Sequence, residues 1–513
     1  MSNEVRVRFA PSPTGVLHIG GVRTALYNYL FAKKHGGKFI LRIEDTDQTR
    51  FVEGAEQYIK DAMAWCGIQI DEGTDQGGEY APYKQSERKD LYKKYAQQMI
   101  NEGTAYYAFD TAEELDEMRE TLKAAKANSL NYNSITRNTM KNSLTLSAEE
   151  VQERLDSGAP YVIRIKVPAK EDIRLNDMIR GWVNVHTSTM DDKVLMKSDG
   201  MPTYHLANVV DDYLMKITHV IRGEEWLPSA PLHVLLYRYL GWEASMPQFA
   251  HLPLLLKPDG NGKLSKRDAA KHGFPIFPME WKITEEDAAL KGFKEEGYLS
   301  EAFVNFLALL GWNPGTENEI FSLEELIEAF TIERVSKAGA KFDIDKAIWF
   351  NQQYLRKMSP SALASLLIEQ TKAAGIACDN NKAIAIAELL QERIDYTPEL
   401  LSKGKYFFES PTEYVDKVVR KKWNETAEAV FNTFSTEIVD QSLQADDFQK
   451  KLEQAVEAHD TKVGMVMQIL RVAITGEAGG PDLMKIMEVL GTNEVADRIK
   501  KATNAFEQTA NNE

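Results

Sequence analysis

The chain has little cysteine and no long apolar run. Its two cysteines, Cys66 and Cys378, stand in 513 residues, too few for a disulfide framework or a cysteine-based zinc site. No segment approaches the run of about 18 to 20 apolar residues that a membrane-spanning helix needs. A secretory signal has an apolar stretch behind a basic segment. The first residues of this chain lack that pattern. We therefore expect a cytoplasmic protein with no membrane partner.

Basic residues are outnumbered by acidic ones. Lys and Arg together number 61, against 77 Asp and Glu, which gives a net charge of −16. This balance argues weakly against a protein that coats nucleic acid, but a local basic groove still allows RNA to bind. The length also excludes a single core, because domains usually stop growing near about 250–300 residues. Several domains are expected.

The first residues predict a strand, a helix and a second strand. Residues 5–9 alternate between apolar residues and arginine, residues 20–35 carry apolar side chains at helical spacing, and residues 38–45 form another apolar run. Gly36-Gly37 ends the helix between them. A βαβ unit of this kind predicts a Rossmann-type, doubly wound parallel sheet.

The sequence after this unit predicts an insertion in the α/β fold and, later, a region of helices alone. An Asn-rich stretch at 125–143 predicts a loop within an insertion, and after about Asp345 the 3.6-residue periodicity predicts helices alone. The last residues, 504–513, are expected to fray. The predicted α/β and all-α domains are the first half of the Rossmann-type domain (1–80), an inserted α+β domain (81–195), the second half of the Rossmann-type domain (196–255), a region with a lysine-rich loop (256–345) and an all-helical region (346–513).

A histidine and two glycines stand where the first strand gives way to the helix, as His18-Ile19-Gly20-Gly21. A helix N-terminus presents free amides and partial positive charge, and glycine lets a phosphate come close to them. His18 could donate to a phosphate oxygen whose charge grows during a displacement. Taken alone, this pattern is more often a glycine-assisted turn with a half-exposed histidine.

A second basic motif lies 245 positions after His18. The segment Lys263-Leu264-Ser265-Lys266-Arg267 places three cations on a short loop behind a glycine. Such a loop suits the triphosphate of ATP. Taken alone, it is more often a solvated basic turn.

Together the two motifs carry a resemblance. Residues 18–21 resemble the "HIGH" signature of class I aminoacyl-tRNA synthetases, and residues 263–267 resemble their "KMSKS" signature. The flanking segments "RFAPSPTG", "RIEDTD", "YHLANVVDD", "VIRGEEW" and "FDIDKAIWFN" narrow the resemblance to bacterial-type glutamyl-tRNA synthetases. Gly21 replaces the second histidine and Arg267 the final serine, both common variants in this branch of the family. Some relatives carry zinc after "AYxCxC", but here Ala108 and Asp110 occupy those cysteine positions, so no structural zinc is expected.

The resemblance implies a two-step reaction. L-Glutamate would react with ATP, in the presence of Mg²⁺, to form glutamyl-adenylate, and the glutamyl group would then pass to the 3′ end of tRNA(Glu). It implies that the insertion binds the acceptor stem, that residues 256–345 contact the stem and that the helical region binds the anticodon. The family norm is a monomer. His18, Lys263 and Lys266 would be catalytic, and the ATP-binding residues would be His18, Gly20, Gly21, Lys263, Ser265, Lys266 and Arg267.

Glutamate itself demands a pocket with two cationic donors and one acid, because it carries two carboxylates and one ammonium group. The resemblance places Arg8 and Arg222 on the carboxylates and Glu44 on the ammonium. Each of these residues could instead serve the fold alone, as a strand-edge arginine or a capping acid. The remaining polar lining would be Ser12, Thr46, Tyr204 and Asn208.

Several questions stay open at this level. Arg393 aligns with the family position that reads the last anticodon base, where arginine favours tRNA(Glu) over tRNA(Gln). The enzyme could nevertheless charge both tRNAs, or the chain could be a catalytically dead RNA-binding protein on the same fold. The segment 272–293 looks longer than the usual link in the family, and its proline and aromatic content predicts a packed excursion of unassigned role.

Overall fold

A computed structural model describes residues 4–265, 267–268, 271, 273–282 and 289–511. The chain divides into two compact units. One comprises Met1–Glu295 and Phe303–Ile344, and the other comprises Glu296–Ala302 and Asp345–Glu513. Within the described ranges, no helix has the length and apolar character that crossing a membrane requires.

The first unit is built on a six-stranded sheet in the order β2-β1-β8-β9-β5-β6. The strands from β2 to β5 run parallel, and only β6 at the edge pairs in the antiparallel direction, with β5. The expected doubly wound sheet is thereby confirmed, with an antiparallel edge added. The strands are β1 (Arg6–Phe9), β2 (Lys38–Leu41), β5 (Asp172–Asp177), β6 (Gly181–His186), β8 (His219–Gly223) and β9 (Gln248–Leu252).

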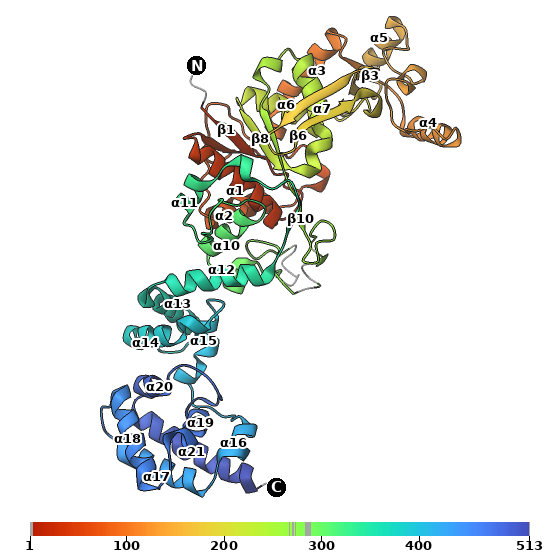
Figure 1. Ribbon diagram of the computed structural model, residues 1–513. Coiled ribbons are helices and arrows are strands. Elements are labelled where there is room, and N and C mark those ends of the chain that lie inside the picture. Colours follow the sequence, from red (N-terminus) through yellow and green to blue (C-terminus); the bar gives the residue numbers. More distant parts are fainter. Residues whose placement is uncertain (1–3, 266, 269–270, 272, 283–288, 512–513) are drawn as a thin grey trace. The chain divides into compact units, whose positions relative to one another are not determined.

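Helices cover this sheet as the βαβ pattern requires. The helix α1 joins β1 to β2 and packs on β1, β2 and β8 because its apolar face is buried almost throughout. It ends at Lys34, and Gly36 just beyond it has a φ of +62°, which favours glycine. The helix α3 packs on α6, and α7 packs on α6 and β5 (Figure 1). The helices are α1 (Ile19–Lys34), α2 (Ala55–Trp65), α3 (Lys89–Asn101), α6 (Tyr204–Leu214) and α7 (Ala230–Tyr239).

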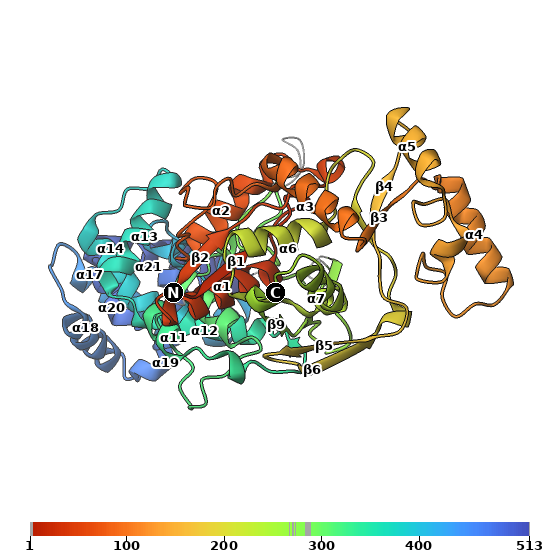
Figure 2. The same ribbon diagram turned by 90° about the horizontal axis from the view of Figure 1, so that it is seen from above.

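The inserted region carries a second, antiparallel sheet in the order β3-β4-β7. Its helices α4 and α5 lie at the end of the unit away from α1 (Figure 2). Each begins with a capping box, in which a Ser or Thr side chain and a Glu three residues later satisfy two free amides. The elements are β3 (Ala105–Ala108), α4 (Ala112–Ala124), α5 (Ala148–Asp156), β4 (Val162–Ile165) and β7 (Val194–Met196).

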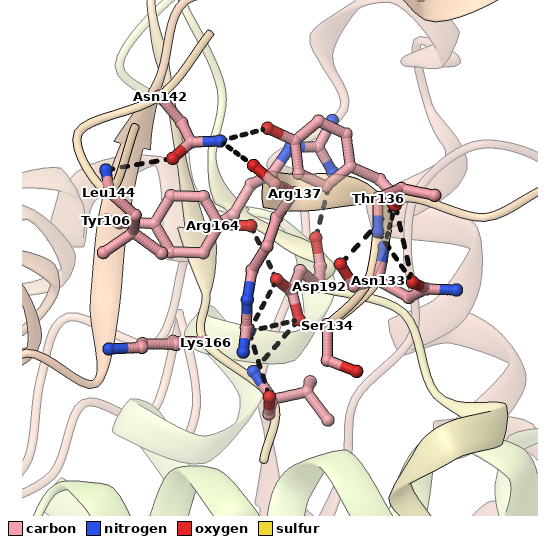
Figure 3. Close-up of polar contacts among 12 residues, drawn as sticks. Tyr106, Asn133, Ser134, Thr136, Arg137, Asn142, Leu144, Arg164, Lys166 and Asp192 are labelled. Atoms are coloured by element: carbon pink, nitrogen blue, oxygen red, sulfur yellow. Dashed lines mark hydrogen bonds and ion pairs between the residues drawn. The ribbon is translucent and has the colours of Figure 1, made fainter. Parts of the chain in front are cut away.

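The Asn-rich stretch at 125–143 is more ordered than the predicted loop. It contains a short 3₁₀ helix, Thr136–Thr139, and contributes to a buried polar cluster around Asp192 (Figure 3). Asp192 accepts hydrogen bonds from Tyr106 Oη at 2.6 Å and Arg137 Nη1 at 3.0 Å. Asn142 is fully buried and donates to the carbonyl of Arg137 at 2.7 Å. Side chains of the stretch thus satisfy backbone groups that a solvated loop would leave to water.

Residues 255–295 and 303–344 complete the first unit. A short parallel pair joins β10 to β11. The described part of the segment 272–293 packs against the catalytic sheet's helices, since Ile19 donates its amide to the carbonyl of Ile276 at 3.0 Å and Tyr58 Oη donates to Met279 O at 2.7 Å. The elements are β10 (Leu255–Leu256), α9 (Phe293–Glu296), α10 (Ser300–Leu309), α11 (Leu323–Ala329) and β11 (Ala340–Lys341).

The second unit has helices only among its described residues, as the periodicity after Asp345 predicts. One hydrophobic cluster runs through it from Leu355 to Phe506. The helices are α12 (Ile344–Lys357), α13 (Pro360–Ala373), α14 (Asn380–Leu390), α15 (Glu399–Lys403), α16 (Asp416–Lys422), α17 (Glu425–Ile438), α18 (Ala445–Ala458), α19 (Val463–Thr475), α20 (Leu483–Leu490) and α21 (Thr492–Asn511).

The expected fraying of residues 504–513 is wrong up to Asn511. The helix α21 continues that far, and the Phe506 side chain is fully buried. Its ring lies with centroid distances of 5.0 Å from Tyr414 and 5.2 Å from Trp423. The low-complexity composition of the tail predicts fraying, but Phe506 stands at a position of the helix that faces the core. Its packing holds the last turns of α21.

Replacement of Phe506 tests this anchor. We expect Phe506→Ala to destabilise the second unit by about 3–5 kcal/mol, because it leaves a cavity among buried aromatic rings. Urea unfolding monitored by circular dichroism measures the loss. Gln508→Ala, at an exposed position of the same helix, is the control and should stay within about 0.5 kcal/mol of wild type. Equal stability of the two variants would contradict the buried position of Phe506.

Candidate active site

A cavity of about 850 Å³ opens at the carboxyl ends of β1 and β8. The chain leaves these neighbouring strands in opposite directions, through α1 toward β2 and through α7 toward β9, so the cavity lies at the switch point of the sheet. It collects residues that are far apart in sequence. The predicted site residues that line it are Arg8, Ser12, His18, Gly20, Gly21, Glu44, Thr46, Tyr204, Asn208, Arg222 and Lys263.

The other four predicted residues are not among those that line this cavity. Ser265 and Arg267 are exposed and lie outside the lining of the cavity. Lys266 lies outside the described residues. Arg393 belongs to the second unit, where it lines a separate cavity of about 890 Å³.

His18 caps the helix α1. Its Nδ1 accepts the amide proton of Gly20 at 3.0 Å, and its carbonyl accepts the amide proton of Gly21 at 2.9 Å. Because Nδ1 is an acceptor, the proton of the neutral ring belongs on Nε2. The imidazole thus has a defined orientation on the wall of the cavity.

The two glycines make room for their neighbours. A Cβ at Gly20 would lie 2.8 Å from His18 Cε1, and a Cβ at Gly21 would lie 2.4 Å from Leu17 Cδ1. The sequence pattern predicts free amides for a phosphate at this point, but the amides of Ile19, Gly20 and Gly21 already have acceptors within the protein. In this structure the glycines permit the close packing of His18 and Leu17 on the first turn.

Lys263 is held at the cavity by an acidic partner. Its Nζ lies 3.0 Å from Glu225 Oε1, and Lys263 also bridges to Leu256 in the short hairpin that begins the lysine-rich loop. Glu225 folds back over Gly223, where a Cβ would lie 2.1 Å from Glu225 Oε2. Burial alone would raise the pKa of Glu225, but its hydrogen bonds and Lys263 outweigh burial and hold the pKa below its usual value.

A buried network of alternating charges forms the floor of the site. Arg8 contacts both oxygens of Asp212, at 3.0 and 3.3 Å. Arg42 donates to Asp212 Oδ1 at 2.7 Å and to Glu44 Oε1 at 3.0 Å. Asn208 and Gln85 donate to the same Glu44 oxygen, at 3.2 and 3.5 Å. Glu44 is therefore fixed from three directions.

The two acids of this network respond differently to burial. Burial raises the pKa of Asp212, but Arg8 and Arg42 outweigh it, so the pKa lies below its usual value. For Glu44, burial dominates over Arg42 and Arg8, so the pKa is raised. Arg42 also lies near a third acid, because its Nε is 3.9 Å from Asp211 Oδ2.

Arg222 and Tyr204 form the opposite wall. Arg222 Nη1 donates to Tyr204 Oη at 2.6 Å and Nη2 donates to the carbonyl of Trp226 at 3.3 Å. The Tyr204 and Trp226 rings lie 4.4 Å apart between centroids. Burial raises the pKa of Tyr204 against the opposing effect of Arg222, so the hydroxyl is neutral near pH 7.

Sequence reasoning missed several residues of the site. Some of them could have been found from the sequence. Asp211-Asp212 interrupt the apolar residues of helix α6, and Arg42 interrupts the apolar run of strand β2 and the residues after it. A charge in such a run needs a buried partner, which points to a polar site. The missed residues are Arg42, Gln85, Lys197, Asp212, Trp226 and His251.

Within the described ranges, no group of three or more His, Cys, Asp or Glu side chains is arranged to hold a metal ion. At Asp110, where some relatives have a zinc cysteine, the carboxylate instead accepts from Tyr132 Oη at 3.0 Å and from the amide of Lys141 at 2.7 Å.

Comparison with known proteins places this site in a family. Residues 4–349 match the model of the catalytic domain of tRNA synthetases class I (E and Q), and residues 347–503 match an anticodon binding domain. The chain belongs to the class I tRNA synthetases. The resemblance drawn from the sequence motifs is therefore confirmed.

Relatives that align with nearly the whole of this synthetase include glutamate–tRNA ligases. A glutamate–tRNA ligase of Cytophaga hutchinsonii is 59% identical over 512 residues, which covers 99% of each chain. One of Amoebophilus asiaticus is 56% identical over 503 residues, which covers 98% of each. The crystal structure of a glutamate tRNA ligase from Elizabethkingia meningosepticum in complex with its amino acid is 48% identical, with a TM-score of 0.95 over 98% of this chain and 100% of that one.

Proposed function

We propose that this synthetase is a glutamate–tRNA ligase, which activates L-glutamate with ATP and transfers it to the 3′ end of tRNA(Glu). The observation that carries the proposal is the single cavity lined by Arg8, Arg222 and Glu44 together with His18 and Lys263. A dicarboxylic amino acid and a polyphosphate both find complementary charges there.

The amino group of glutamate fits the Glu44 end of the cavity. Glu44 supplies a buried carboxylate, and the neighbouring Asn208 Oδ1 is a buried acceptor with no hydrogen-bond partner among the described residues. An unsatisfied buried acceptor costs about 1–3 kcal/mol. An ammonium group would satisfy it, while Arg8 and Arg222 hold the carboxylates. Ser12 and Thr46 would complete the polar lining.

Activation needs no side-chain nucleophile. The α-carboxylate of glutamate attacks the α-phosphorus of ATP, a new C–O–P linkage forms, and the bond to pyrophosphate breaks. Both reactants are anions, so the enzyme contributes positioning and positive charge. We assign His18 Nε2–H and the Lys263 ammonium to the phosphates, with Lys266, Ser265 and Arg267 as further ATP-binding residues of the same loop. Gly20 and Gly21 keep the entrance open.

We propose that Mg²⁺ binds together with the substrate ATP. Because the described residues offer no cluster of metal ligands, the ion would enter on the phosphate oxygens of ATP, as Mg²⁺ commonly does, and would neutralise their charge. The residues of the chain would then contact the phosphates and leave the ion largely to water.

Recognition of tRNA is assigned to three regions. The insertion would bind the acceptor stem, residues 256–345 would contact the stem, and the helices of the second unit would bind the anticodon. Arg393 supports the last assignment, because it lines a cavity beside Lys403, Lys405 and Tyr406, whose cations and ring suit a phosphate and a base. We further propose that the enzyme acts as a monomer in the cytoplasm, where translation takes place.

Charging assays with purified tRNAs test the function. We expect labelled glutamate to be esterified to tRNA(Glu), labelled glutamine to be rejected, and ATP–pyrophosphate exchange to depend on added tRNA. Glutamylation of tRNA(Gln) at a similar rate would identify a non-discriminating enzyme. Absence of both exchange and charging would identify an RNA-binding protein and overturn the proposal.

Replacement of Lys266 tests the lysine-rich loop. Lys266→Ala should lower the rates of pyrophosphate exchange and charging by at least about 10²-fold, because the departing pyrophosphate loses a cation. The circular dichroism spectrum should not change. Lys271→Ala, which removes an exposed lysine next to the signature, is the control and should retain the wild-type rates. Wild-type charging by Lys266→Ala would remove the loop from the mechanism.

Replacement of Arg393 tests anticodon reading. Arg393→Gln should lower the ratio of kcat/KM for tRNA(Glu) to that for tRNA(Gln) by about tenfold or more, because a paired arginine contact to a base is worth about 1–3 kcal/mol of discrimination. Lys450→Gln, on the exposed face of α18, serves as the control. An unchanged ratio in Arg393→Gln would refute the assignment.

A further inference from the structure

Behind the Arg222 guanidinium lies a chain of buried polar side chains. Asp177 Oδ2 lies 2.6 Å from His251 Nδ1, and His251 Nε2 lies 3.0 Å from Arg222 Nε. The three residues come from the carboxyl-terminal halves of adjacent strands, β5, β9 and β8, and none exceeds 5% exposure. The reaction described above makes no use of Asp177 or His251.

The hydrogen bonds determine which ring nitrogen of His251 carries the proton. Asp177 Oδ1 already accepts three backbone amides, those of Ile179 at 3.0 Å, Arg180 at 2.8 Å and His251 at 3.3 Å. The second oxygen accepts Nδ1–H of His251. Since the Nε–H of an arginine is always a donor, His251 Nε2 must be the unprotonated acceptor. Only one neutral tautomer satisfies both neighbours.

The charge state of the ring agrees with this arrangement. Burial lowers the pKa of His251, Asp177 opposes that effect, and Arg222 adds to it, so the net pKa lies below the usual value and the ring is neutral near pH 7. A second ring proton would be on Nε2 of His251 and would point at the Nε–H group of Arg222. Asp177 is itself ionised, because the hydrogen bonds from His251 and the backbone outweigh its burial and lower its pKa.

Arg222 lines the cavity and has more N–H groups than the protein gives it acceptors. Of its five N–H groups, one donates to His251, one to Tyr204 Oη and one to the carbonyl of Trp226. Within the described part of the chain, this leaves two N–H groups, one on each terminal nitrogen, on the wall of the cavity. Two N–H groups are what a carboxylate accepts in a paired contact. The direction of that pair depends on the bond at Nε.

We infer that Asp177 and His251 are positioning residues for substrate specificity: Asp177 sets the tautomer of His251, and His251 holds the Arg222 guanidinium in the plane that receives a carboxylate of glutamate. This inference rests on the proposed function. It gives β5, from the region predicted as an insertion, a role behind the amino acid pocket, through Asp177 and His251.

The variant Asp177→Asn separates positioning from packing. Asn is the same size, and its oxygen must stay at the Oδ1 position to accept the three backbone amides. Its NH₂ group then faces His251 Nδ1, which forces the ring proton onto Nε2 and against Arg222. We expect KM for glutamate to rise about 10–100-fold, the usual effect of losing a residue that orients a ligand-binding group. KM for ATP and the melting temperature should change little.

Two measurements identify the mechanism. In ¹⁵N-histidine spectra, the proton of His251 should be on Nδ1 in wild type and on Nε2 in Asp177→Asn. The variant His251→Phe, which removes the acceptor and keeps a ring, should raise KM for glutamate to a similar extent. Because Asp177 acts through His251, the double variant should be no worse than His251→Phe alone.

The matched control is Asp192→Asn. Asp192 is an equally buried aspartate that accepts from Tyr106, Arg137 and the amide of Val167, but it lies next to β7 in the β3-β4-β7 sheet and not in the sheet that carries Arg222. Its variant should leave KM for glutamate unchanged. Wild-type KM for glutamate in both Asp177→Asn and His251→Phe would overturn the inference while leaving the ligase function intact. Failure of the wild-type enzyme to charge glutamate would instead refute the proposed function.

Discussion

The buried contacts of Asp212 with Arg8 and Arg42 are the interactions on which the catalytic unit depends. Asp212 lies on α6, 204 positions from Arg8 and 170 from Arg42. These contacts join the first half of the sheet to the half that follows the insertion. Removal of one partner of a buried ion pair costs about 3–5 kcal/mol, because the other charge is left without compensation. The pocket and the continuity of the fold thus depend on the same carboxylate.

This arrangement also explains how the site is prepared for a charged substrate. Buried arginines are desolvated when the chain folds, and their orientation is set by Asp212, Tyr204 and His251. A ligand therefore meets donors that need little reorganisation, which is the source of most electrostatic catalysis and selectivity. The same hydrogen bonds stabilise the fold and orient the arginines that would bind the substrate.

The motifs that identify the family have roles that their patterns alone do not show. The glycines after His18 stand where a Cβ would come within 2.8 Å of His18 Cε1 and 2.4 Å of Leu17 Cδ1, and the amides of that turn are already bonded. Ile276, from the segment of unassigned role, takes the first of these amides. The entrance of the cavity is therefore built in part by Ile19 and Ile276, which are 257 positions apart (276 − 19).

Local patterns determined the βαβ start, the helical second unit and the identity of Arg8, Glu44, His18, Arg222 and Lys263 as candidates, because strand and helix periodicity act over a few residues and family motifs are contiguous. They could not reveal that Asp212 pairs with Arg8, that β5 and β6 extend the catalytic sheet, or that Phe506 anchors the last helix. Those features require partners from distant parts of the chain. Only packing brings such partners within hydrogen-bond or van der Waals distance, so the tertiary structure decided them.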